Sequence, residues 1–238
     1  MKPTVATCLT ALSLSLISLV TWAEPATKIQ ASYDVIGFGM TLANITETFT
    51  RTQDTYQIES ITQAVGMLAR FKPETIRVIS RGKFTTQGLQ PLAYSLVREV
   101  DTHKNASAKF NWDKSTLTHT DYKGVNDLAL PVGTQDRLSV LYHLPMLSKA
   151  IQSEYKFNIT DGNNLEPYDF NLAPDEREVT VPLDTYKTRY VSNIPVGEEV
   201  KYEIWLAIDR HYFPCKIIVT DAKGGKLTQE LTKLTITP

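Results

Sequence analysis

The chain has 238 residues, of which 42% are hydrophobic and 21% are charged. Its 25 Lys and Arg residues nearly balance its 26 Asp and Glu residues, and no run of like charges occurs. The length is enough to bury a sizeable core, and the charge balance argues against a nucleic-acid-binding footprint and against a polybasic membrane patch.

Residues 1–23 have the pattern of a secretory signal peptide. Lys2 supplies a positive start, Cys8 to Val20 is an apolar stretch too short to span a bilayer comfortably, and Ala23 is a small residue at the cleavage position. An uncleaved N-terminal anchor is the alternative interpretation. Cleavage after Ala23 predicts a periplasmic protein with no integral membrane segment after processing and one β-rich domain over residues 24–238.

Cys215 is the one cysteine that remains after cleavage, because Cys8 belongs to the leader. A disulfide within one mature chain is therefore impossible, even in a compartment that permits disulfides. Cys215 follows Phe213-Pro214 and precedes the apolar run Ile217 to Val219. This context favours a buried, inert thiol over a reactive one.

Most of the mature chain alternates apolar and polar residues with a period of two, which is typical of β-strands wet on one face. The clearest predicted strand covers residues 200–208. Similar alternation predicts strands around Ala31 to Val35, Ala43 to Phe49, Tyr155 to Ile159 and Val179 to Leu183. Turn signals stand between such runs, at Gln53-Asp54, Asp113-Lys114, Asp161-Gly162-Asn163 and Lys223-Gly224-Gly225. The pattern predicts a mainly β, single-domain curved antiparallel sheet or half-open barrel of many short strands.

One segment breaks this pattern and predicts an amphipathic helix over about residues 134–151. Thr134 is a candidate N-cap, and Pro145 should kink or restart the helix. The apolar face consists of Leu138, Leu141 and Tyr142. His143 falls near the helix end, where a charged imidazole would interact favourably with the dipole, so a structural role is the simplest interpretation. Because a lone helix in a β protein must bury its apolar face, we expect it on the concave face of the sheet.

A second, weaker helical turn is predicted over Ala64 to Phe71, ended by Pro73. Trp112 and Trp205 fall where alternation places them opposite the more apolar face, so they either line a ligand cavity, cover an interface or serve ordinary packing. The candidate ligand-binding residues are Met67, Leu68, Phe71, Trp112 and Trp205.

Portable catalytic and metal-binding motifs are absent from the sequence, which has no G-x-S-x-G elbow, H-E-x-x-H pair, Gly-rich phosphate loop or C-x-x-C pair. The remaining candidate for a metal or hydrolytic site combines imidazoles with carboxylates on neighbouring predicted strands, at Asp101, His103, His119 and Asp121. Their spacing is nonspecific, and solvated hairpin positions are the simpler interpretation. We therefore assign no catalytic residue, no metal site and no cofactor.

The sequence LPVGTQDRLSVLY over residues 130–142 is the most specific of several stretches that share one pattern. The others are YDV at 33–35, TYQIES at 55–60 with GMLA at 66–69, SRGKF at 80–84 leading to GLQP at 88–91, and WLA at 205–207. Together they resemble a family of exported bacterial proteins, domain-of-unknown-function family 3108. The resemblance implies a periplasmic, β-rich protein and brings no established reaction or catalytic residue.

Three functions are compatible with these features. The leading hypothesis is a noncatalytic periplasmic protein that binds an apolar ligand such as a lipid or acyl chain, by fold-level analogy with half-open periplasmic lipoprotein carriers. The alternative is an envelope assembly or scaffold protein that acts through protein contacts. A hydrolase of envelope polymers is the least favoured, because its site would rest on the four residues named above.

Overall fold

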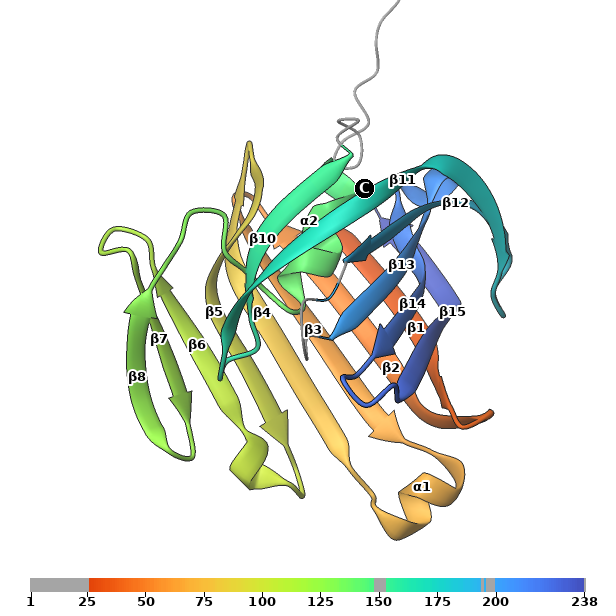
Figure 1. The fold of residues 1–238 in the computed structure, drawn as a ribbon, viewed down its shortest axis with the longest axis horizontal. Helices are drawn as coiled ribbons and strands as arrows, with labels where there is room; N and C mark the ends of the chain where they lie inside the picture. The colour runs from red at the N-terminus through yellow and green to blue at the C-terminus, as the bar shows by residue number, and fades with distance from the viewer. Residues whose placement is uncertain (1–25, 148–152, 194, 196–199, 238) are drawn as a thin grey trace, which may run out of the picture.

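The computed structural model describes residues 26–147, 153–193, 195 and 200–237, and it consists of one continuous, curved sheet of 15 strands (Figure 1). Strands that follow one another in sequence pair antiparallel almost throughout, and β1 also pairs with β15. This pairing joins two arms of the sheet that curve toward each other. The signal peptide predicted over residues 1–23 lies outside the described residues.

The first arm runs from β1 outward to a free edge at β8. Its strands are β1 (Lys28–Gly37), β2 (Met40–Thr52), β3 (Thr55–Ala64), β4 (Thr75–Thr85), β5 (Gly88–Arg98), β6 (Ala106–Asn111), β7 (Thr116–Asp121) and β8 (Gly124–Ala129). The short helix α1 (Gly66–Phe71) connects β3 to β4, as the weak helical pattern predicts, and the 3-10 turn η1 (Thr102–Lys104) connects β5 to β6.

The second arm runs from β15 to β9. Its strands are β9 (Gln135–Asp136), β10 (Glu154–Thr160), β11 (Leu165–Thr180), β12 (Thr185–Asn193), β13 (Lys201–Ala207), β14 (Phe213–Thr220) and β15 (Lys226–Thr237). The 3-10 turn η2 (Ile208–Arg210) connects β13 to β14, and β9 is the exception in the ladder because it pairs parallel to β10.

Alternation predicts the strands well where one face is buried. On β1, for example, Ala31, Tyr33 and Val35 are buried while the residues between them are partly exposed, and the strands expected near residues 43, 155 and 200 are confirmed as β2, β10 and β13. The strand expected around Val179 to Leu183 ends earlier, at Thr180. The next residues form the β11–β12 turn, closed by a hydrogen bond from the Val181 amide to the Asp184 carbonyl, 3.0 Å.

Helix α2 (Ser139–Leu147) lies between the two arms, on the concave face, as expected (Figure 1). The predicted start at Thr134 is wrong, because the preceding Gln135–Asp136 pair as strand β9 and Asp136 supplies the cap instead. Pro145 lies inside α2, and the predicted extension past Leu147 falls on residues 148–151, outside the described part. Val140 and Leu144 pack on the second arm.

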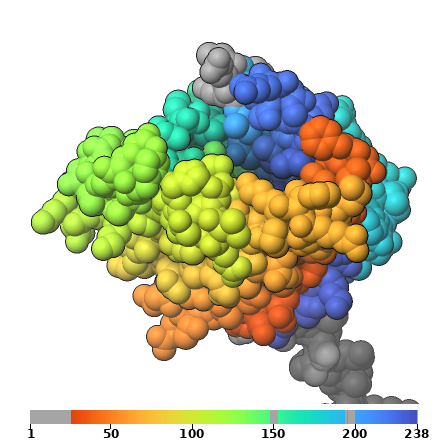
Figure 2. Space-filling view, turned by 90° about the horizontal axis from the view of Figure 1, so that it is seen from below, coloured from red at the N-terminus to blue at the C-terminus, as the bar shows by residue number. Residues whose placement is uncertain are grey.

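The end of the molecule that carries α1, which we call the α1 end, is shown in Figure 2. The β1–β2 turn (orange-red), α1 (gold) and the β14–β15 hairpin (blue) lie around a recess there. Helix α2 lies deeper between the arms (Figure 1). Within the described residues, no helix is long and apolar enough to cross a membrane.

Candidate functional site

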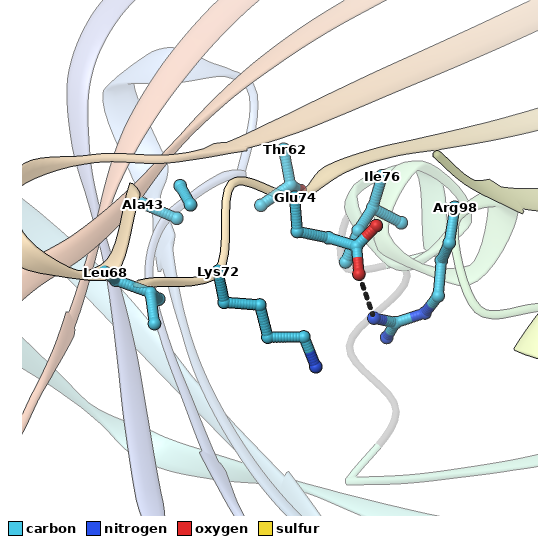
Figure 3. Close-up of a pocket in the computed structure, with 8 residues that line it drawn as sticks. Ala43, Thr62, Leu68, Lys72, Glu74, Ile76 and Arg98 are labelled. Atoms are coloured by element: carbon cyan, nitrogen blue, oxygen red, sulfur yellow. Dashed lines mark ion pairs between the residues drawn. The ribbon is translucent and has the colours of Figure 1, made fainter. Parts of the chain in front are cut away.

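Two cavities lie against the concave face of the sheet. The first, which we call the β2–β5 cavity, has a volume of about 210 Å³ (Figure 3). It is lined by residues of β2 to β5 and of the α1 connection, namely Ala43, Thr62, Ala64, Leu68, Lys72, Glu74, Ile76 and Arg98. Half of this lining is small or apolar, and the other half is polar or charged, including Glu74 and Arg98, which form an ion pair at 3.7 Å.

The second cavity, which we call the α2 cavity, has a volume of about 240 Å³ and lies between α2 and the second arm. Its lining is mostly aliphatic and aromatic and consists of Arg137, Val140, Leu141, Ile159, Phe170, Tyr202, Ile204, Ile217, Val219 and Gln229. The pairing of β13 and β14 explains this wall, because Ile204 lies opposite Ile217 and Tyr202 opposite Val219 on one face. Such a lining can hold an apolar chain.

Arg137 is the one cation in the wall of the α2 cavity. Its guanidinium lies 3.4 Å from the Asp161 carboxylate, and its side chain is 44% exposed. The other oxygen of Asp161 accepts hydrogen bonds from the amides of Asn163 and Asn164, at 2.8 Å each. Arginine has five N–H donors, and one long contact to Asp161 leaves donors for an anionic group at the cavity mouth.

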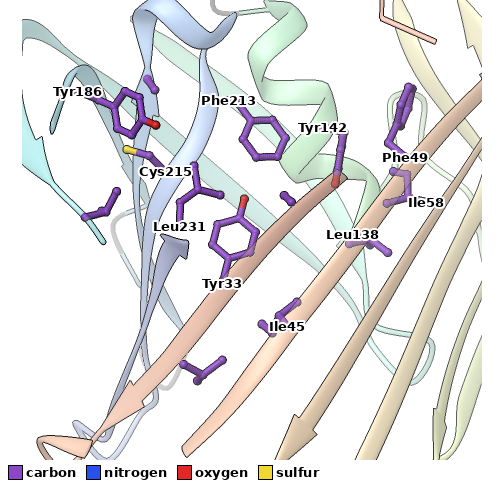
Figure 4. Packing of buried hydrophobic residues seen from close by; sticks show 14 of the residues in the cluster. Tyr33, Ile45, Phe49, Ile58, Leu138, Tyr142, Tyr186, Phe213, Cys215 and Leu231 are labelled. Atoms are coloured by element: carbon purple, nitrogen blue, oxygen red, sulfur yellow. The ribbon is translucent and has the colours of Figure 1, made fainter. Parts of the chain in front are cut away.

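On the side of α2 that faces the first arm, buried side chains pack closely together (Figure 4). The ring of Tyr142, from α2, stacks on Phe49, from β2, with centroids 5.4 Å apart. The Tyr142 hydroxyl donates to the Glu47 carboxyl at 3.0 Å. Burial raises the pKa of Glu47, so the neutral acid is favoured inside this apolar cluster.

Asp136 anchors the start of α2 to the first arm. Its carboxylate accepts hydrogen bonds from the amides of Leu138 (3.0 Å) and Ser139 (2.7 Å) and from the Ser80 hydroxyl (2.6 Å). The Asp136 amide donates to the Ser139 hydroxyl at 2.9 Å, which completes a reciprocal cap. Burial raises the pKa of Asp136 to about 6 even though these hydrogen bonds oppose the shift. Because Asp136, Ser80 and Ser139 are fully buried, this network is structural.

His143 packs and hydrogen-bonds inside the fold, which agrees with the structural role expected for it. The residue lies within α2 and is buried, and its Nδ1 accepts a hydrogen bond from the Leu89 amide at 3.0 Å. Burial lowers the pKa of His143 to about 4. Gly88 makes room for the ring, because a Cβ built there would stand 2.6 Å from it.

The four residues of the predicted metal or hydrolytic site have different environments. Asp101 pairs with His103 at 3.1 Å and with Lys104 at 2.8 Å on the surface around η1. His119, on β7, is buried and hydrogen-bonds the Thr160 hydroxyl at 2.7 Å, and burial lowers its pKa. Within the described ranges, no group of three or more His, Cys, Asp or Glu side chains is placed to hold a metal ion.

The five predicted ligand-binding residues are scattered over the fold. Leu68 lines the β2–β5 cavity, while Met67 and Phe71 are exposed on the same helix. Trp112 packs against Phe110, with its indole N–H donating to a backbone carbonyl at 2.7 Å. Trp205 lies on the outer face of β13, where it contacts Tyr190 and Lys216.

Most of the cavity residues escape sequence reasoning because they come from strands far apart in the chain. Arg137 belongs to the most specific sequence stretch, but its charge was assigned no role. In the sequence, Val219 and Gln229 look like ordinary positions of alternating strands. One signal in the sequence points to the cavity, namely the predicted burial of the 134–151 helix on the concave face. Any space that the helix leaves unfilled there must be lined by apolar strand faces.

Comparison with known proteins identifies the family of this chain. The model for "Protein of unknown function (DUF3108)" matches residues 28–232. The chain belongs to this family. The match runs from β1 into β15, so the family pattern covers nearly the whole described sheet and confirms the resemblance seen in the sequence. No curated protein matches the chain.

The DUF3108 sheet is similar to a solved structure of another family. A beta-barrel-like protein of domain of unknown function DUF1849 from Brucella abortus superimposes with a TM-score of 0.57 at 13% sequence identity. The match covers 89% of this chain and 98% of that chain. At this identity the similarity concerns the fold alone, and it agrees with the curved, barrel-like course of the 15 strands.

Proposed function

We propose that this DUF3108 protein is a noncatalytic, exported protein that binds an apolar ligand, a lipid or acyl chain, between the arms of its sheet. The observation that carries the proposal is the α2 cavity, whose lining combines aliphatic and aromatic side chains with the single cation Arg137. The leader pattern of residues 1–23 supports a periplasmic location.

The size of the cavity favours a slender ligand. Sites for compact, drug-sized molecules span roughly 300–1,000 Å³, whereas the α2 cavity measures about 240 Å³. A single acyl chain needs a narrow apolar channel rather than a wide pocket. When the acyl chain of the ligand lies against Ile204 and Ile217, its carboxylate or phosphate head group would meet the N–H donors of Arg137. An anionic amphiphile is therefore the preferred class of ligand.

Fluorescence binding of cis-parinaric acid to the mature protein tests the proposal. Val219→Trp, at the partly exposed edge of the cavity, should block entry and weaken binding at least about tenfold. Ile218→Trp is the matched control, because this neighbour on β14 has similar exposure and faces the opposite side. Saturable binding by wild type and Ile218→Trp, but not by Val219→Trp, supports the proposal. No saturable binding by wild type, or equal binding by all three proteins, refutes it.

The head-group contact has its own test. Arg137→Gln should weaken binding of the fatty acid about tenfold and leave binding of the corresponding fatty alcohol unchanged, because only the acid forms an ion pair with Arg137. Arg77→Gln serves as the control, since Arg77 lies on the outer face and pairs with Glu59. If Arg137→Gln weakens acid and alcohol equally, the cavity recognises the chain and not the anionic head.

A role in envelope assembly is the second candidate, supported by the free edge of the sheet. Strand β8 pairs only with β7 within the described residues, and Val125 on it is 70% exposed. An unpaired edge can accept a strand from another protein. Crosslinking in cells from a photoreactive residue at Val125 should capture a protein partner, and recovery of monomer alone would count against this role.

A further inference from the structure

Large apolar side chains protrude from three connections at the α1 end. Phe38, in the β1–β2 turn, is 90% exposed, and Phe71 and Met67, on α1, are 81% and 66% exposed. Met40 beside the turn and Leu227 at the β14–β15 hairpin are also exposed. We call these five residues the apolar rim. A solvent-exposed group of this kind indicates a surface that has a partner.

The three connections that carry the apolar rim are neighbours in space (Figure 2). A Cβ built at Gly37 would lie 2.7 Å from the Leu42 side chain and 3.0 Å from the Leu227 side chain, so the turn is packed against the hairpin. The amide of Val65, just before α1, donates to the Leu42 carbonyl at 2.9 Å. The rim therefore forms one surface from distant parts of the sequence.

Cations accompany the apolar rim. Arg70 and Lys72 lie on or next to α1, and Lys223 and Lys226 lie in the β14–β15 hairpin. Arg70, Lys223 and Lys226 form no ion pair with another described residue, whereas Lys72 lies 3.7 Å from Asp101. The composition has no polybasic run, but the fold gathers these charges around exposed phenylalanines and methionines. Apolar side chains beside free cations suit the interface of a bilayer with anionic head groups.

We propose that the α1 end docks on the surface of an anionic lipid bilayer, with the apolar rim inserted among the acyl chains. Helix α1 has six residues and lies at the tip, so it can enter the interface without spanning the bilayer. Both cavities approach this end, because Leu68 of α1 lines one and Val219 of the other pairs with Leu227. The inference is independent of the proposed ligand, since it rests on the exposed rim and the cations around it.

Flotation of the mature protein with vesicles tests the docking. Wild type should bind vesicles of phosphatidylcholine mixed with phosphatidylglycerol, and the double variant Phe38→Ser with Phe71→Ser should lose at least about tenfold in partition. Val132→Ser is the matched control, because Val132 is 95% exposed. It lies near the β6–β7 turn, whereas α1 and η1 both connect strands at the opposite end of the sheet. Lys223→Gln with Lys226→Gln should reduce binding to the anionic vesicles several-fold.

Insertion has a direct readout that does not depend on those variants. Phe38→Trp should give a blue-shifted emission that bromine-labelled lipid quenches, whereas Val132→Trp should not respond. The proposal is overturned if wild type does not float with anionic vesicles, or if the rim double variant floats as well as wild type. It is also overturned if sedimentation shows that the rim pairs two copies of the chain, with no binding to lipid. A fatty-acid probe that still binds the non-floating double variant would separate this result from the cavity proposal.

Discussion

His143 should make the fold sensitive to acid, and the size of the effect follows from its environment. Its pKa is about 4 in the folded protein against a usual value of 6.5. The unfolded chain therefore takes up the proton first as the pH falls. The stability that depends on the neutral ring is fully present above about pH 6.5 and is lost as the pH falls through about 4, a change of about 3 kcal/mol. Protonation also removes the acceptor for the Leu89 amide.

Asp136 should change the stability of the fold in the opposite direction over nearly the same pH range. Its pKa is raised from 3.8 to about 6, so the folded state takes up the proton first. The corresponding stabilisation is fully present below about pH 3.8 and is lost as the pH rises through about 6, again about 3 kcal/mol. The two contributions largely offset each other in the wild type, so only variants that remove one group at a time reveal them.

Urea unfolding between about pH 4 and pH 7.5, followed by fluorescence, measures these contributions for each variant. His143→Asn keeps an acceptor for the Leu89 amide, and its stability deficit relative to wild type should shrink by about 3 kcal/mol toward pH 4. Asp136→Asn should show a deficit that grows by about the same amount. His211→Asn, at an exposed position in the η2 turn, is the control for the substitution itself. Parallel curves for wild type and His143→Asn would refute the reasoning, because the ring would then have the same proton affinity in both states.

Three further predictions concern packing. Leu144→Ala should destabilise the protein by about 2–5 kcal/mol in urea unfolding, because Leu144 is fully buried between α2 and the second arm. Gly82→Ala should cost about 1–3 kcal/mol or more, since its Cβ would stand 2.1 Å from the Gln90 carbonyl oxygen, and a melting temperature equal to wild type would contradict this contact. Cys215 is buried and burial raises its thiol pKa to about 12, so a disulfide reagent should modify it only after urea is added. Rapid labelling of the native protein would contradict that burial.

The sequence predicts this fold where local pattern and tertiary packing agree. Strand β1 buries every second residue from Ala31 onward, and on β13 the buried Ile204 and Leu206 flank the half-buried Trp205, an alternation that is visible without a structure. The helix start was misplaced because Thr134 and Asp136 are both good capping residues, and the choice depends on Ser80 of β4, which lies far away in the sequence. For a similar reason, the position of His143 in the helix does not by itself reveal that its ring is buried against Leu89.

The candidate site was less accessible from the sequence. The apolar residues of segment 64–71 make it a candidate binding segment from the sequence, and one of them, Leu68, lines a cavity. The apolar rim has one local signal in the sequence, because Phe38 stands between two glycines. Phe71 joins Phe38 through the packing of α1 on β2, and Leu227 joins it through the pairing of β1 with β15, which no local pattern specifies.

The anchoring of α2 accounts for the position of the hollow. Polar contacts hold the start of the helix to the first arm through Asp136 and Ser80, and its middle through His143 and Leu89. Tyr142 then packs into the first arm, while Val140 and Leu141, near the start of the helix, line the α2 cavity against the second arm. The helix therefore packs on Phe49 of β2 and leaves space beside β13 and β14. Because the same anchors set the acid sensitivity, protonation of His143 should weaken the attachment of the helix whose Val140 and Leu141 line the proposed binding site.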